Sequence, residues 1–408
     1  MPAAAVDSPP PVITGPISEP SYWPLDTSYD FLNHGSFGSV PKPIEAAQRR
    51  YRDLIEAKPI EMLGRRCREL LVAPRQSVAK LLGADPDGLG FVTNATEGIN
   101  AVLRSLDLRP GDVLLTTNHV YYAVRQAMRL IARRAGAEVR VVDVPLPIAR
   151  PSDVTERIAK AIDARTRLVV VDHVTSPTAI VFPIAEIAQM CQERSVDCLV
   201  DGAHAPGMLE VNVRAMGATY FTGNLHKWVC APKGCGVLWV NEERRRDVQP
   251  VIVSHFLDEG FDVEFDWQGT RDISPWLAAT DAIALWESVG WDRMRAHNQG
   301  LSRWVQRFLC ERFDVAPLTP LTEWTNAAGA GTEADAMIGS MVTVPLPNGI
   351  ETRFPSVEAC QAALYEHHRI EIPIIAWENR WHCRASCQTY NRPEQYRRLA
   401  DAVLSLCA

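Results

Sequence analysis

The sequence has no excess of basic residues. Its 42 Lys and Arg residues are outnumbered by 49 Asp and Glu residues, so the formal net charge of the 408-residue chain is −7. Proteins that bind nucleic acids carry a basic surface that neutralises phosphate groups. The charge balance therefore argues against a nucleic-acid partner.

Long apolar runs are also missing. No stretch approaches the roughly 18 consecutive apolar residues of a membrane-spanning helix. The first residues, MPAAAVDSPPPVITGPISEP, contain neither the basic nor the apolar part of a secretory signal peptide. We therefore expect a cytoplasmic protein that makes no contact with a membrane.

The ten cysteines form no metal-binding or disulfide pattern. None belongs to a CxxC pair, and none is spaced with histidines as zinc ligands are. In a cytoplasmic protein, such cysteines are expected to be reduced thiols. The sequence predicts no metal site.

The composition is otherwise that of a globular protein, with 47% hydrophobic and 22% charged residues. The chain is longer than one hydrophobic core usually supports, so we expect one large domain and one smaller domain. Residues 1 to about 20 are rich in Pro, Ser and Ala, which predicts a disordered or loosely packed arm. The segment AAGAGTE at 326–332 predicts a flexible surface loop.

Short apolar strands alternate with helical patterns through much of the chain. Apolar residues at helical spacing predict helices between residues 43 and 82. Strands are then predicted at 88–92, 112–116, 138–144, 167–174 and 197–204, with two more at 218–224 and 234–240. Val-, Ile- and Leu-rich strands joined by helices are typical of a mostly parallel sheet that is covered on both faces. A helix at 276–312 is predicted to lead into a small α+β unit.

The most informative segment is YFTGNLHKWVCAPKGCGVLWV at 220–240. Lys227 lies here between His and Trp in an otherwise apolar stretch, although lysine is rarely buried without a partner. Apolar surroundings lower the pKa of a lysine amine, which suits Schiff-base chemistry. The alternative is a surface lysine whose charged end reaches solvent.

Three upstream segments favour the buried interpretation. In VDGAH, Asp201 ends an apolar strand at the sheet edge where α/β proteins bind ligands, and its carboxylate could pair with a pyridinium nitrogen or cap a helix. In FVTNATEGIN, the backbone N–H groups at 95–97 and the Thr96 hydroxyl could form a phosphate cradle, or Thr96 and Glu97 could simply cap a helix. Tyr121 could stack on a planar cofactor or pack in the core.

Taken in order, these motifs resemble the isopenicillin N epimerase-like family, in the class V aminotransferase group of fold-type I pyridoxal-phosphate enzymes. The resemblance covers residues from about 30 to 400. It rests on LNHGSFGSVP (32–41), NATEGIN (94–100), HVTSPTA (173–179), VDGAHAPG (200–207), GNLHKWVCAPKG (223–234), FDWQGTRDISPWLA (265–278) and RASCQTYN (384–391). It implies an α/β fold with a mostly parallel seven-stranded sheet in a large domain and a small α+β C-terminal domain. The expected boundaries are a Pro-rich arm at 1–30, a large cofactor-binding domain at 31–290 and a small domain at 291–408.

The resemblance also implies pyridoxal 5′-phosphate as the cofactor and a role for each matching residue. Lys227 would bind the cofactor covalently and act as the catalytic base. Asp201 would pair with the pyridinium nitrogen, His204 would approach the phenolic oxygen and Tyr121 would stack on the ring. The phosphate would be held by Ala95, Thr96, Asn224 and His226, and by Thr270 of a neighbouring subunit.

The same resemblance assigns substrate contacts. Arg384 would bind the α-carboxylate of an amino-acid substrate, for which a two-pronged guanidinium is well shaped. The substrate entrance would be lined by Asn33, His34, Gly35, Ser36 and Phe37. Because Thr270 would reach across subunits, we expect a homodimer with its sites at the interface. One departure from relatives is Ala179, which stands where a glycine is usual.

Three reactions compete once a base has removed the Cα proton: β-elimination, epimerisation and transamination. We favour a C–S lyase reaction on an S-substituted cysteine conjugate, in natural-product or antibiotic biosynthesis. The alternatives are epimerisation of the isopenicillin N type, decarboxylation-coupled oxidative deamination of a cysteine conjugate, and a catalytically silent binding protein of the same fold.

Two features of the sequence bear on these alternatives. Epimerisation needs a second acid on the far face of the substrate, and the candidates are Tyr122, His34 and His255. A desulfurase-type reaction needs a nucleophilic cysteine on a loop shortly before Arg384, and no cysteine lies between Cys360 and Cys383. Transamination is the least favoured of the three reactions, and a desulfurase is not expected.

Overall fold

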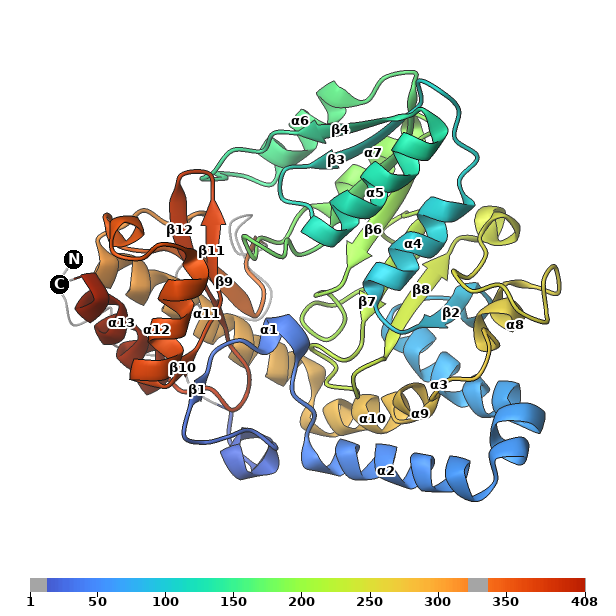
Figure 1. The fold of residues 1–408 in the computed structure, drawn as a ribbon, viewed down its shortest axis with the longest axis horizontal. Coiled ribbons are helices and arrows are strands. Elements are labelled where there is room, and N and C mark those ends of the chain that lie inside the picture. The colour runs from blue at the N-terminus through green and yellow to red at the C-terminus, as the bar shows by residue number, and fades with distance from the viewer. Residues whose placement is uncertain (1–12, 322–336, 408) are drawn as a thin grey trace.

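The computed structural model describes residues 13–321 and 337–407, so the surface loop expected at 326–332 lies outside the described residues. A seven-stranded sheet forms its centre, with the order β2-β8-β7-β6-β5-β3-β4 (Figure 1). The strands are β2 (Leu89–Val92), β3 (Val113–Thr117), β4 (Glu138–Val142), β5 (Thr166–Asp172), β6 (Asp197–Gly202), β7 (Tyr220–Asn224) and β8 (Gly236–Val240). Strand β8 runs antiparallel to both of its neighbours, β2 and β7, and the other strand pairs of this sheet are parallel. The expectation of a mostly parallel seven-stranded sheet is confirmed.

Helices cover both faces of the sheet because apolar side chains of the strands point alternately to one face and the other. Leu114, Leu168 and Leu199 point into a core shared with α4 (Ala95–Ser105) and α5 (Tyr122–Ala135). Val113 and Val169, one residue away, point into a second core on the opposite face. Successive strand residues face opposite sides of a sheet, so an uninterrupted apolar strand needs cover on both. The opposite core is closed by α3 (Cys67–Leu81), α6 (Ser152–Ala161), α7 (Ile184–Glu193) and α10 (Ala279–Val289).

The helical regions are more divided than the sequence predicts. Between residues 42 and 81 the chain forms α2 (Lys42–Ala57), a π-helical turn (Ile60–Arg65) and α3. The prediction of a single helix at 276–312 is wrong. The segment forms three helices, α9 (Ser274–Leu277), α10 and α11 (Trp291–Phe313). Gly290 separates α10 from α11, and its φ of 93° is unfavourable for other residues.

A smaller antiparallel sheet has its own core. Its order is β11-β12-β9, formed by β9 (Met341–Pro345), β11 (Ile374–Trp377) and β12 (Arg380–Ser386). It packs with α11, α12 (Val357–His368) and α13 (Pro393–Cys407), seen in orange and red in Figure 1. The short strand β1 (Asp30–Phe31) pairs with β10 (Ile370–Glu371), and Leu32 enters the same core. N-terminal residues thus help to build this unit, while the domain boundaries stay a prediction.

The described part of the N-terminal arm is packed against the rest of the protein. Ile13, Ile17 and Trp23 are buried in a cluster with Trp286 and Tyr390. The Trp23 indole N–H donates a hydrogen bond to the Ile17 carbonyl at 3.0 Å. For residues 13–20 the expectation of a loose or disordered arm is therefore wrong, because Ile13 and Ile17 are buried among side chains from elsewhere in the fold. Residues 1–12 lie outside the described part.

Within residues 13–321 and 337–407, no helix combines the length and the apolar character that crossing a membrane requires.

The packing of the arm can be measured by substitution of Trp23, which is 1% exposed. We expect Trp23→Ala to lower the free energy of unfolding by about 3–5 kcal/mol, because the indole leaves a cavity and an unpaired carbonyl. Urea titration of the purified protein, followed by circular dichroism, measures the change. Tyr122→Ala is the control, because Tyr122 is 70% exposed, and it should change stability by less than about 0.5 kcal/mol. Equal stability of the two variants would contradict the packing.

Candidate functional site

Most of the expected site residues meet in one cavity of about 710 Å³. It lies beside the carboxyl ends of β5, β6 and β7, the sheet edge where α/β proteins bind ligands. Residues from α1 (His34–Phe37) and from the smaller sheet close its other side. The expected residues that line it are Gly35, Ser36, Phe37, Ala95, Thr96, Tyr121, Asp201, His204, Asn224, His226, Lys227 and Arg384.

Lys227 lines the cavity in the loop that joins β7 and β8. Burial lowers the pKa of its amine to about 7, and the nearby Arg384 charge acts in the same direction. The carboxylates of Asp201 and Asp172 oppose this shift. Near neutral pH a substantial fraction of the amine is therefore unprotonated, and a neutral amine can act as a nucleophile or a base.

His204 contacts the Lys227 amine. Its Nε2 lies 3.2 Å from the Lys227 Nζ, and the Trp228 indole N–H donates to its Nδ1 at 3.4 Å. Burial holds the pKa of His204 well below its ordinary value, and the Lys227 charge lowers it further. Because an indole N–H can only donate, the single proton of the neutral ring is assigned to Nε2. His204 therefore donates a hydrogen bond toward the amine.

The N-terminus of α4 forms another wall of the cavity. The Asn94 side chain caps the helix by accepting the Glu97 N–H at 3.0 Å, and Asn224 accepts the Ala95 N–H at 2.8 Å. Asn94, rather than Thr96, is thus the capping residue, and Thr96 lines the cavity. A helix N-terminus with backbone N–H groups at a cavity is suited to a phosphate group.

Arg384 lies on β12 and is held on two sides. One Nη donates to the Ser176 carbonyl at 2.6 Å and to its hydroxyl at 3.2 Å, and the other donates to the Ser36 hydroxyl at 3.1 Å. Its Nε is buried and has no hydrogen-bond partner within the described residues. Burial lowers the pKa of the guanidinium to about 10, so it remains charged at neutral pH. A fixed cation with an unused donor is suited to a carboxylate ligand.

The sequence motifs did not predict Asp172, an acidic residue that lines the cavity. It ends β5 next to Asp201 of β6, and its Oδ2 accepts the Tyr121 N–H at 3.2 Å. The signal was available, because Asp172 is an acidic residue that ends a buried apolar strand, the same pattern that drew attention to Asp201. The Tyr121 side chain is 44% exposed and also lines the cavity.

Two residues expected at the substrate entrance do not line the cavity. His34 is fully buried behind Lys227, where its Nε2–H donates to the Lys227 carbonyl at 3.0 Å and its Nδ1 accepts from the Tyr390 hydroxyl at 2.9 Å. The Asn33 amide N–H donates to Glu371 at 3.1 Å. Their side chains thus hold the α1 segment and the lysine loop in place, which corrects the expectation of substrate contact.

Two residues near the site have backbone angles in the left-handed region. Gly38 has a φ of 69°, and an added Cβ would collide with the His226 carbonyl, so the turn after α1 needs glycine. Ala179 has a φ of 56°, the left-handed region that glycine prefers. An alanine in this region carries backbone strain of about 1 kcal/mol relative to glycine.

Thr270 is exposed and does not line the cavity of its own chain. Its expected role toward a neighbouring subunit stays a prediction.

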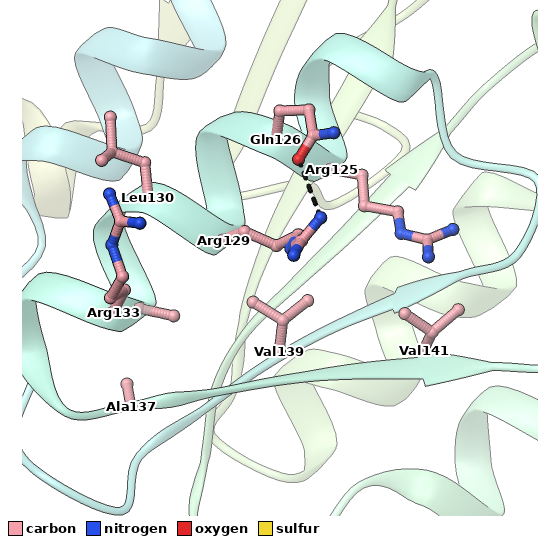
Figure 2. A pocket seen from close by; sticks show the side chains of 9 residues that line it. Arg125, Gln126, Arg129, Leu130, Arg133, Ala137, Val139 and Val141 are labelled. Atoms are coloured by element: carbon pink, nitrogen blue, oxygen red, sulfur yellow. Dashed lines mark hydrogen bonds between the residues drawn. The ribbon is translucent and has the colours of Figure 1, made fainter.

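A second hollow of about 760 Å³ lies between α5 and the edge strand β4. Figure 2 shows Arg125, Arg129 and Arg133 of α5 beside the side chains of Val139 and Val141. Its described lining has no carboxyl, thiol, imidazole or hydroxyl group. It therefore lacks the acid–base and nucleophilic groups that mark a catalytic site.

The position of His34 generates a prediction about stability. We expect His34→Ala to lower the free energy of unfolding by about 2–4 kcal/mol, because the Tyr390 hydroxyl loses a buried partner and a cavity remains. Urea titration of the apoenzyme measures the loss. The exposed His367, replaced by Ala, is the matched control and should change stability by less than about 0.5 kcal/mol. An unchanged stability in His34→Ala would show that these contacts do not hold the loop.

Known proteins are similar to this chain over most of its length. Residues 39–399 match the family described as aminotransferase class-V. Isopenicillin N epimerase from Streptomyces clavuligerus is 31% identical, with 94% of this chain and 96% of the relative covered. A probable chloroplastic L-cysteine desulfhydrase from Arabidopsis thaliana is 29% identical, with 93% and 83% covered. The solved structure of the cystine C–S lyase C-DES with its product cysteine persulfide shares the fold, with a TM-score of 0.74 and 21% identity over 92% of this chain and 97% of that chain. The chain therefore belongs to the aminotransferase class-V family, whose members are pyridoxal-phosphate enzymes.

Proposed function

We propose that this enzyme is a C–S lyase, which eliminates a thiol from Cβ of an S-substituted cysteine of the kind formed in natural-product biosynthesis. The observation that carries the proposal is the content of the cavity: one amine for the Cα proton, one guanidinium for the carboxylate, and no thiol. The names of two relatives from Arabidopsis thaliana, a probable chloroplastic L-cysteine desulfhydrase and an L-cysteine desulfhydrase, support the same bond cleavage.

The residues of the cavity fit pyridoxal phosphate. An amine, a buried carboxyl group and a helix N-terminus lie around one space, and these match the cofactor's aldehyde, pyridine nitrogen and phosphate. We assign Lys227 to the aldehyde, Asp201 to the nitrogen, His204 to the phenolic oxygen, Tyr121 to the ring face, and Ala95, Thr96, Asn224 and His226 to the phosphate. When bound, the cofactor withdraws electrons from the substrate Cα, which makes the Cα–H bond acidic.

The protein's own groups then direct the reaction. Arg384 binds the substrate carboxylate, and Lys227 in its neutral form takes the Cα proton. The electron pair of the Cα–H bond forms a Cα–Cβ double bond, while the Cβ–S pair leaves with sulfur, which takes up a proton. With one water molecule, the products are a thiol, pyruvate and ammonium.

The cysteines argue against transfer of sulfur to the protein. Nine of the ten are buried, the tenth is Cys407 near the C-terminus of the described chain, and none lines the cavity. A desulfurase-type reaction needs a nucleophilic thiol within reach of the substrate sulfur. The sulfur is therefore released as a free thiol.

Epimerisation is the second candidate, because an isopenicillin N epimerase is among the similar proteins. It needs a second acid opposite Lys227. None of the candidates Tyr122, His34 and His255 lines the described cavity: His34 is buried behind the lysine, and the other two are exposed elsewhere. This arrangement favours elimination.

We also infer a homodimer. Thr270 matches a residue that reaches the phosphate of the neighbouring subunit in related dimers, and in its own chain it is exposed and outside the cavity.

A single incubation can distinguish elimination from epimerisation. Holoenzyme in heavy water is mixed with an S-substituted L-cysteine, and the products are identified by mass spectrometry. We expect equal amounts of thiol and pyruvate, and their absence with Lys227→Ala. Intact amino acid with deuterium at Cα and no pyruvate would instead establish epimerisation and overturn the proposal.

Arg384 supplies a second prediction. Arg384→Gln removes the charge but keeps a polar side chain of moderate size. We expect kcat/KM to fall about 100-fold, because a charge-assisted bidentate contact to the substrate carboxylate is lost. Steady-state thiol release measures this, and the cofactor absorption of the variant serves as the control for an intact site. An unchanged kcat/KM would remove Arg384 from the carboxylate site.

The lowered pKa of Lys227 predicts how cofactor capture depends on pH. Because the free amine has a pKa of about 7, the rate of pyridoxal-phosphate uptake by apoenzyme should rise about tenfold from pH 6 to pH 8 and then level off. Stopped-flow absorbance measures the rate. N-acetyl-lysine is the control, since its amine with an ordinary pKa near 10 should show about a 100-fold rise and no plateau before pH 9. The same profile for apoenzyme would contradict a lowered pKa.

A further inference from the structure

Two carboxyl groups lie side by side at the floor of the cavity. Asp172 is the last residue of β5 and Asp201 is the last but one of the neighbouring parallel strand β6, and their Cα atoms are direct partners in the register. Both line the cavity, and they are 3% and 4% exposed. Neighbouring strands are separated by about 4.8 Å, so two negative charges here would repel each other strongly in a poorly solvated place.

The two carboxyl groups differ in what they contact. Asp201 Oδ1 accepts the Ala203 N–H at 2.9 Å within its own turn. Asp172 Oδ2 accepts the Tyr121 N–H at 3.2 Å, and the nearby Ser176 N–H acts to lower the pKa of the Asp172 carboxyl group. Asp172 Oδ1 is buried and has no partner among the described residues. One oxygen of Asp172 thus holds the turn that carries Tyr121, while the other is unused.

The cations near the pair cannot neutralise two carboxylates. The ionisable groups that line the cavity besides these two are Tyr121, His204, His226, Lys227 and Arg384. Burial keeps the pKa of both histidines below the ordinary value, so they are neutral. The cation whose charge acts on both carboxyl groups is Lys227, and burial lowers its own pKa. One amine therefore cannot neutralise two carboxylates.

We propose that Asp172 is a second, protonated carboxyl group of the cofactor site, which donates a hydrogen bond into the cavity through Oδ1 while Asp201 alone carries negative charge. The inference depends on the cofactor site and not on which reaction follows. Burial and the charge of Asp201 both raise the pKa of Asp172 well above its ordinary value, against the opposing N–H groups of Ser176 and Tyr121 and the charge of Lys227. Burial raises the pKa of Asp201 as well, but the Ala203 N–H and the Lys227 charge oppose that shift, and the repulsion within the pair adds only to the shift of Asp172. Asp172 is then a positioning residue that holds the Tyr121 turn and limits the cavity floor to one charge.

Asp172→Asn distinguishes a neutral carboxyl group from an ionised one. The amide keeps the size of the side chain, an acceptor for the Tyr121 N–H and a donor in place of the O–H. A neutral Asp172 means that this variant changes no charge. We therefore expect the pH titration of the holoenzyme's visible cofactor absorption to keep its midpoint within about 0.3 pH unit, and the Kd for pyridoxal phosphate to stay within about threefold.

Asp201→Asn is the matched control, because it makes the same atomic change at the neighbouring strand. Loss of a real negative charge beside the cofactor should lower the midpoint by about one pH unit or more and raise the Kd at least about tenfold. If Asp172→Asn lowers the midpoint by as much as Asp201→Asn does, Asp172 is ionised and the proposal is wrong.

Asp172→Ala tests the hydrogen bonds themselves. It removes both the donor and the acceptor for the Tyr121 turn, so the Kd for pyridoxal phosphate should rise about tenfold, while Asp172→Asn retains binding. Unchanged binding in Asp172→Ala would overturn the proposal. Infrared spectra of the holoenzyme give a direct readout, because the carbonyl stretch of a protonated carboxyl group should vanish in Asp172→Asn. None of these measurements uses a substrate, so they stand even if the C–S lyase reaction fails.

Discussion

The site depends on one constraint, the burial of a lysine amine at the carboxyl edge of a parallel sheet. Desolvation disfavours the charged ammonium and lowers the pKa of Lys227 to about 7. That single shift makes the amine available as a nucleophile and a base. Other groups follow from it: His204 is neutral and faces the amine, and His34 holds the carbonyl of the same residue from behind. Without burial, Lys227 would be an ordinary surface cation.

The ionisable groups of the cavity come from two sides. The carboxyl groups of Asp172 and Asp201 come from the large sheet, while Arg384 comes from the small antiparallel sheet and is held by Ser36 and Ser176. The two halves of the site thus belong to two separately packed cores. A substrate carboxylate would bind at the side of Arg384, and the reacting Cα would lie toward Lys227. This division explains why residues far apart in the chain serve one small cavity.

Local patterns were enough to predict most of the large sheet. Strands with an uninterrupted apolar run, such as residues 168–171, need cover on both faces, and β5, β6 and β7 follow that rule. The same patterns did not predict a helix boundary that depends on a single residue. Gly290 sits within a helical pattern, and only its φ of 93° separates α10 from α11. The prediction of a loosely packed N-terminal arm failed for a different reason. The arm packs beside Trp23, which is buried by partners from distant segments, such as Trp286 and Tyr390.

The sequence by itself determined the chemistry that is available: a lysine in an apolar loop, acidic residues at strand ends, a capped helix start and an arginine on a late strand. Tertiary structure decided which of these groups face one another. It placed His34 behind Lys227 instead of at the entrance, and it set Asp172 beside Asp201 through the register of β5 and β6. The physical reason is that strand register and the docking of two cores depend on long-range packing, which short-range periodicity does not encode.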